Sequence, residues 1–433
     1  MFIVAKNGGH ENWVGEFELD LPLGMLSRAR FLVHYASKAQ TKKYEAEVVE
    51  LLGHKGLAVL CMSYDAFMTD KGRDVAKRFL VQRKCLYVLD EAHRAKNPAT
   101  KRVKRLLASA PYAKIRRVLT GTPISKGPFD VWSQVQFACP GFWDAKGVGD
   151  FEVFKAMFGV FHNWKNPETE RIQRLCVGYR NLPLLHKWLM EVGSRVTKDV
   201  LNLPPKLYTR STYELSREQE RVYDELVDGA FAELPPEGYV SSNMAMTLML
   251  RLHQVCCGYV PMDHDLGLHM FKDNPRLEQF QEDLQDVTSG CIIWCCFTND
   301  IDLILAHMKD KGMEAVRYDG KTSDDDKLEA KQRFSEGKVQ FFVANPAAAG
   351  ESLTLLHGTS VMYYSQNCRL LDRLQSEDRS HRKGQLNKVL YRDYEALRPG
   401  GGKTVERAIV RNLQGKVDVA SQITGDELRE WIK

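Results

Sequence analysis

The chain has 433 residues, of which 44% are hydrophobic and 27% charged, a composition that excludes disordered, collagen-like and membrane proteins. Its net charge of +5 permits a nucleic-acid surface without demonstrating one. No apolar run approaches the ~18 residues of a membrane span, and the first residues lack the layout of a signal peptide. We therefore expect a soluble, intracellular protein of two or three domains, in the cytoplasm or nucleoid, or in a host cell if it is viral.

The ten cysteines do not indicate a metal site or disulfides. Most of them lie inside apolar stretches, and no CxxC pair occurs anywhere in the sequence. Buried thiols in a reducing compartment explain this pattern better than a zinc centre does.

Short β-rich runs alternate with amphipathic helical stretches near the start of the chain and again after residue 271, which is the pattern of βαβ units building parallel sheets. Between these parts the sequence predicts helices and no strand. We therefore predict an α/β protein with two parallel-sheet domains. The expected parts are a first domain at 1–140, a helical insertion at 141–200, a linker with helices at 201–270 and a second domain at 271–433.

Strands are expected at 2–5, 31–35, 57–61, 85–90 and 118–121 in the first domain. In the second domain the sequence predicts helices at 275–286, 299–311 and 323–336. The last of these three helices begins after the N-cap Ser323 and stops at Gly337.

The stretch CLYVLDEAHRAKN places Asp90 and Glu91 directly after an apolar run. This position is the carboxyl end of a buried parallel strand, where open α/β sheets bind their ligands. An aspartate there can hold Mg²⁺, and a neighbouring glutamate can orient and deprotonate an attacking water. The alternative is a helix N-cap followed by an acid in the first turn.

Two further groups of side chains are candidates for a functional site. Thr120 and Thr122 flank Gly121 at a second strand end, which places two hydroxyls on a tight turn near the carboxylates. In the second domain, Gln375, Arg379 and Arg382 are spaced by four and three and are expected on one helical face. Guanidinium pairs suit the charge on a phosphoryl group in transfer, whereas the alternative is a solvated helix in which Asp378 pairs with Arg382.

Seven strings occur in an order that resembles the superfamily 2 ATPases of the Swi/Snf type. They are DEAHRAKN, LTGTPI, SRVTKDVLNLPPK, CIIWCCFTNDID, YDGKTS, ANPAAAGESLTL and QSEDRSHRKGQ. The resemblance implies two RecA-like lobes that hydrolyse ATP with Mg²⁺ in the cleft between them. It also implies tracking along double-stranded DNA, mainly through backbone contacts and generally without unwinding.

The resemblance implies roles for residues of the nucleotide site. Asp90 and Glu91 resemble the Walker B pair that holds Mg²⁺ and activates water, and Arg379 and Arg382 look like arginine fingers, with Gln375 on the same face. The residues that look like nucleotide-contacting or coupling elements are His93, Thr120, Thr122, Gly350 and Glu351.

The resemblance also implies DNA contacts. KNGGHENW and Ser63-Tyr64 resemble backbone-contacting motifs of the first lobe, although Lys6 stands where the family usually has proline, and Thr354 belongs to a motif of the second lobe that touches both nucleotide and DNA. The alternative for Lys6, Asn7 and His10 is a polar loop. Phosphate contacts of this kind predict sequence-tolerant, salt-sensitive binding.

The phosphate-binding pattern GxxxxGK[ST] does not occur in the 433 residues, and PGGGKT at 399–404 does not match it because Leu397 stands where its leading glycine would be. In the family this loop and the adenine-reading glutamine lie upstream of KNGGHENW, so the first lobe is expected to lack its opening βα unit. Because the missing strand should be interior to the sheet, its neighbours would lose hydrogen-bond partners.

Three explanations stay open for the missing loop. A second polypeptide or upstream coding sequence could supply the P-loop, the chain could be a non-hydrolysing DNA-binding or scaffold protein, or the lobe could have rebuilt its sheet. The first is favoured by the intact acids and arginines. We predict a Swi/Snf-type DNA translocase or helicase-like ATPase, or the larger part of one.

Overall fold

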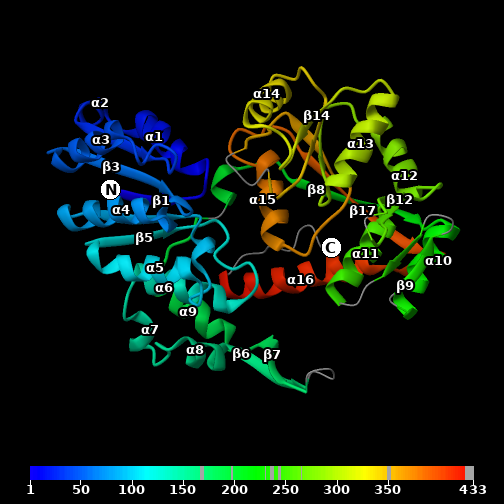
Figure 1. Cartoon of the computed structure of the whole chain (residues 1–433), viewed down its shortest axis with the longest axis horizontal. Coiled ribbons are helices and arrows are strands. Elements are labelled where there is room, and N and C mark those ends of the chain that lie inside the picture. The colour runs from blue at the N-terminus through cyan, green and yellow to red at the C-terminus, as the bar shows by residue number, and fades with distance from the viewer. Residues whose placement is uncertain are drawn as a thin grey trace. The chain divides into compact units, whose positions relative to one another are not determined.

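The computed structural model describes residues 1–165, 170–196, 198–229, 231–234, 238–241, 245–264, 266–348 and 353–424. The chain divides into two compact units (Figure 1). Unit 1 contains Met1–Arg195 and the end of the last helix from Asp418 onward, and unit 2 contains Val196–Val417. Within the described residues, no helix has both the length and the apolar character needed to cross a membrane.

Unit 1 is built on a parallel five-stranded sheet with the order β2-β3-β1-β4-β5. Every residue of β1 is buried, as expected for a central strand covered on both faces. The strands are β1 (Phe2–Ala5), β2 (Ala29–His34), β3 (Leu57–Ser63), β4 (Leu86–Asp90) and β5 (Ile115–Leu119).

Helices cover both faces of this sheet. Alternation along β1 sends Phe2 and Val4 to a core shared with α3, α4 and α5, whereas Ile3 and Ala5 face the side on which Trp13 of α1 packs. These helices are α1 (Gly9–Asp20), α3 (Lys42–Gly53), α4 (Asp70–Gln82) and α5 (Lys101–Ser109), and the short α2 (Leu23–Leu26) follows α1.

The prediction that no strand occurs at 141–200 is wrong. An antiparallel hairpin, β6 (Gly159–Lys165) and β7 (Ile172–Tyr179), lies between helices and projects from α8 in Figure 1. The hairpin is hidden in the sequence because its apolar residues are mostly exposed, so they do not produce a core-like run. The helices here are α6 (Trp132–Ala138), α7 (Phe142–Ala145), α8 (Phe151–Phe158) and α9 (Leu182–Val192).

Unit 2 contains a seven-stranded sheet in which β14, β15, β13, β16 and β17 lie side by side and parallel. Strand β8 pairs parallel with β17 along nine residues of its free edge, and β18 pairs antiparallel with the end of β17. The strands are β8 (Lys206–Glu214), β13 (Gly290–Trp294), β14 (Ala315–Tyr318), β15 (Phe341–Ala344), β16 (Gly358–Tyr363), β17 (Val389–Arg398) and β18 (Gly402–Lys403).

The helices of unit 2 match the predicted ranges at α12, α13 and α14 to within one residue at each end. Ser323 caps α14 by accepting from the Asp326 amide, as predicted. The helices are α10 (Arg217–Gly229), α11 (Ala245–Cys256), α12 (Pro275–Gln285), α13 (Thr298–Asp310), α14 (Asp324–Ser335), α15 (Leu370–Ser380) and α16 (Val405–Thr424).

Residues 201–270 belong to the core of unit 2 and do not form a separate linker. β8 is a strand of its sheet, and Val222 of α10 and Val255 of α11 are fully buried in the same core as Ile293. Two short hairpins accompany these helices, β9 (Phe231–Leu234) with β10 (Gly238–Ser241) and β11 (Tyr259–Pro261) with β12 (Leu268–Met270). The predicted linker at 201–270 is therefore corrected to a part of unit 2, whereas the other domain boundaries stay predictions.

Candidate functional site

Asp90 ends β4 at the carboxyl edge of the unit 1 sheet, as predicted. Its Oδ2 accepts from the indole Nε1 of Trp13 at 3.0 Å, and its Oδ1 accepts from the Glu91 amide at 2.9 Å. The hydroxyl of Tyr64 donates to the backbone oxygen of Asp90 at 2.7 Å. Burial raises the pKa of Asp90 above its ordinary value, and the Trp13 hydrogen bond acts in the opposite direction.

Glu91 follows in the left-handed region, with φ 48° and ψ 52°. A residue with a Cβ pays about 1–2 kcal/mol for this conformation, and such strain concentrates at functional sites. The turn directs Glu91 toward His93, whose Nδ1 lies 3.2 Å from its Oε2 and 3.5 Å from the Thr120 hydroxyl. The Thr120 hydroxyl also accepts from the Thr122 amide at 3.2 Å, so the five predicted groups form one connected cluster.

The helix N-cap alternative for this acidic pair is not supported. The 3-10 helix Ala92–Ala95 begins after Glu91, and Glu91 makes no side-chain cap hydrogen bond. The chemistry of the donors fits Mg²⁺, because carboxylate oxygens are its usual protein ligands. Each carboxylate oxygen of Asp90 accepts a hydrogen bond from a described residue, and such an oxygen can accept more than one partner.

The residues predicted to contact DNA in unit 1 separate into accessible and buried ones. Asn7 is exposed and Lys6 is half-buried, whereas His10, Ser63 and Tyr64 are at most 5% exposed. The buried three cannot present their side chains to a phosphate backbone, because α1 turns His10 inward while Ser63 caps the next turn and Tyr64 supports Asp90. DNA contact by these three side chains is therefore not supported by the structure.

Sequence reasoning missed two supports of the site. One is Trp13, which reaches Asp90 from α1 and is separated from it by 77 residues. The other is Asp130, whose Oδ2 accepts from the amides of Ser125 and Lys126 and from the Ser125 hydroxyl at 2.8–3.0 Å. A lone acid eight residues after Thr122 gave no signal, because the loop that it closes forms only in the fold.

In unit 2, two predicted arginines converge on one segment. Arg379 Nη1 donates to the Leu353 carbonyl at 3.3 Å, and Arg382 Nη1 donates to the Thr354 hydroxyl at 2.9 Å. The predicted single helical face is wrong, because α15 ends at Ser380 and the chain leaves helical geometry at residue 381. The pair is therefore brought together by the 353–354 segment.

The structure describes only one of the three other residues of unit 2 that are predicted to contact the nucleotide. Gln375 lies half-buried on α15. Gly350 and Glu351 fall outside the described residues. The alternative in which Asp378 pairs with Arg382 is also wrong, because Asp378 pairs with Lys198.

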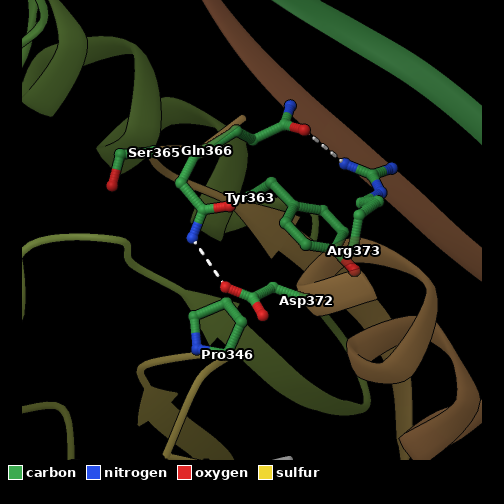
Figure 2. Close-up of a pocket in the computed structure, with 7 residues that line it drawn as sticks. Pro346, Tyr363, Ser365, Gln366, Asp372 and Arg373 are labelled. Carbon is green, nitrogen blue, oxygen red and sulfur yellow. Dashed lines mark hydrogen bonds between the residues drawn. The ribbon is translucent and has the colours of Figure 1, made fainter. Parts of the chain in front are cut away.

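A buried network holds α15 in place. Arg373 is bonded to Glu377 and Asp393, and Lys206 Nζ of β8 reaches Glu377 at 2.7 Å. Although burial opposes ionisation, Lys206 and Arg373 hold the pKa of Glu377 at about 2. Figure 2 shows the small hollow beside this network, in which Gln366 accepts from Arg373. Because Arg373 already has two carboxylate partners, the hollow does not suit a phosphate.

A second buried network contains three residues that could act as metal ligands. Donor atoms of His253, Cys257 and Glu406 lie within 4.8 Å of one another. The guanidinium of Arg276, which is fully buried, donates to both Glu406 and Cys257. A fixed cation thus already neutralises this cluster, so it does not fit a metal ion.

The family model for the SNF2-related domain matches residues 1–259. The chain belongs to the SNF2-related family. The model for the helicase conserved C-terminal domain matches residues 276–384, which contain α12 to α15 and both arginines. The predicted α/β class and the resemblance to Swi/Snf-type ATPases are thereby confirmed.

Individual relatives of this SNF2-related chain are distant. It is 26% identical over 97% of its length to a probable ATP-dependent DNA helicase of Arabidopsis thaliana and 23% identical over 100% to a probable chromatin-remodeling complex ATPase chain of Oryza sativa. It spans 37% and 38% of those proteins. The SWI2/SNF2 ATPase core of Sulfolobus solfataricus in complex with dsDNA is 20% identical, with a TM-score of 0.38 over 100% of this chain and 86% of that one.

Proposed function

We propose that the chain is the larger part of an ATPase that moves along double-stranded DNA. SNF2-family membership implies ATP use, and one observation carries the rest: the acidic pair at the end of β4, with Glu91 held in a strained left-handed turn and connected through His93 to Thr120. Asp90 would hold Mg²⁺, which when bound neutralises phosphate charge. Glu91 would orient and deprotonate the attacking water.

The second unit supplies the positive groups in this proposal. Arg379 and Arg382 would stabilise the charge on the transferring phosphoryl group, and Gln375, Gly350 and Glu351 would contact the nucleotide. His93, Thr120 and Thr122 would couple the nucleotide site to DNA. Lys6, Asn7 and Thr354 would contact the DNA backbone, so that binding depends on salt and little on sequence.

We further propose that a second polypeptide, or a segment outside these 433 residues, supplies the phosphate-binding loop. The expectation that the absent strand leaves interior neighbours without hydrogen-bond partners is wrong, because the five strands of unit 1 pair without a gap. An added strand would therefore join at an edge. Among the described strands, β5 pairs with β4 alone, and Ile115 and Leu119 expose 47% and 42% of their surface. A parallel strand there would end beside Thr120 and one strand away from Asp90, at the carboxyl edge where α/β sheets bind their ligands.

The test is DNA-stimulated phosphate release, measured with this chain alone and with the phosphate-loop segment added. We expect hydrolysis that requires the added segment and is lost in Glu91→Gln and in Arg382→Ala, while both variants still bind DNA. Salt-sensitive DNA binding with no hydrolysis in any combination would instead identify a non-hydrolysing DNA-binding protein.

A further inference from the structure

The excess of positive over negative charge in this protein comes from one segment. Residues 92–129 contain ten Lys and Arg and no Asp or Glu, whereas the rest of the chain has 51 Lys and Arg against 56 Asp and Glu. The segment therefore accounts for the whole positive excess of the chain. In unit 1 it forms the 3-10 turn after the acidic pair, α5, β5 and the following loop.

One side of α5 is fixed to the neighbouring loop by arginines. Arg102 pairs with Asp65 at 2.7 Å, and Arg105 Nη1 donates to the Met68 carbonyl at 2.6 Å. Because residues three apart on a helix share a face, these two arginines attach α5 to the loop that follows β3. Asp65 also accepts from Asn7 Nδ2 at 3.2 Å, which connects α5 to the predicted DNA-contacting loop.

The adjacent row of α5 presents Lys101 and Lys104, which are both exposed. The structure gives neither lysine an ion pair with a described acid, although it forms such pairs for many surface lysines, including Lys71 and Lys146. Two unpaired ammonium groups in a segment without acids produce a local positive potential that suits a polyanion. Asp65 connects Asn7 to Arg102, which is the neighbour of Lys101 on α5. The two lysines therefore extend the predicted DNA-contacting surface that includes Asn7.

We propose that Lys101 and Lys104 form an additional contact surface for the phosphodiester backbone of duplex DNA, continuing the path that begins at Lys6 and Asn7. This inference rests on the proposed function, because it extends the DNA contact of the same protein. The two lysines add affinity and not sequence preference, since ammonium groups bind phosphates as point charges.

The experiment compares duplex binding by the wild-type protein, Lys101→Glu/Lys104→Glu and the matched control Lys55→Glu/Lys84→Glu, over a series of salt concentrations. Lys55 and Lys84 are exposed and precede β3 and β4, so they lie at the amino edge of the sheet. The control makes the same charge change at the opposite edge. The neutral variant Lys101→Gln/Lys104→Gln separates loss of contact from introduced repulsion.

Each phosphate contact contributes about 0.9 to the slope of log affinity against log salt concentration. We expect the slope to fall by about 1.8 in both Lys101/Lys104 variants and to stay unchanged in the control. Equal slopes in the variants and the control, with clear wild-type binding, would overturn this inference and leave the proposed function standing. A wild-type protein that shows no salt-sensitive duplex binding would overturn the proposed function itself.

Discussion

The left-handed backbone at Glu91 predicts that glycine is more stable there than alanine. Both Glu91→Gly and Glu91→Ala remove the carboxylate and its contact with His93, so their difference isolates the backbone. Alanine keeps the left-handed cost of about 1–2 kcal/mol, which glycine avoids. Glycine loses about 0.5–1 kcal/mol more backbone entropy on folding. The Glu91→Gly variant should therefore be about 0.5–1 kcal/mol more stable than Glu91→Ala.

For a unit of about 150–250 residues, ~1 kcal/mol moves the melting temperature by about 2–4 °C. The Gly variant should therefore melt about 1–4 °C above the Ala variant. Tryptophan fluorescence is a suitable probe, because five of the seven tryptophans lie in unit 1. Neither variant should release phosphate under conditions in which the wild-type protein does. An Ala variant that melts at or above the Gly variant would refute a strained turn at the site.

Three further changes test the supports of the two units. Trp13→Phe keeps an aromatic ring but removes the indole N–H that donates to Asp90. The Mg²⁺ concentration for half-maximal ATP hydrolysis should then rise roughly fivefold, equivalent to one hydrogen bond of ~1 kcal/mol, and an unchanged Mg²⁺ requirement would contradict this role of Trp13. Because the pKa of Glu377 is about 2 in the fold against an ordinary 4.5, its roughly 3 kcal/mol of stability is complete above pH about 4.5 and is lost as the pH falls toward 2. Urea unfolding of Glu377→Gln should lack that acid-dependent part, and a profile parallel to the wild type would count against the pairing. Arg276→Met leaves Glu406 buried without its guanidinium partner and should cost about 3–5 kcal/mol in urea unfolding, whereas a loss below ~1 kcal/mol would show that the network contributes little.

Much of the fold could be predicted because buried strands and capped helices leave strong patterns. β4 was readable as a continuous apolar run that ends at Asp90, and α14 as a helix between Ser323 and Gly337. β5 begins at Ile115, three residues before the start of the strand predicted at 118–121. The sequence does not show this start because the first residues include Arg116 and Arg117, and an exposed edge strand does not need an apolar run. The sequence predicts a linker at the position of β8. A strand that joins the edge of a sheet can be recognised only together with its pairing partner, which for β8 is β17.

The candidate site was partly predictable for the same reason. Asp90, Glu91 and Thr120 follow neighbouring parallel strands, so their proximity follows from the sheet. Arg379 and Arg382 were paired by an assumed helical face, whereas a separate segment at Leu353 and Thr354 joins them. Such supports come from contacts between residues far apart in the chain, and their spacing leaves no local signal.

The most direct measurement of the central claim is DNA-stimulated phosphate release in the presence of the phosphate-loop segment. It would compare the wild-type protein, Glu91→Gln of unit 1 and Arg382→Ala of unit 2, with duplex binding measured in parallel. The account predicts that each substitution alone abolishes release and leaves DNA binding intact. Hydrolysis that continues at the wild-type rate in either variant would contradict the claim that these carboxylates and arginines act on one ATP.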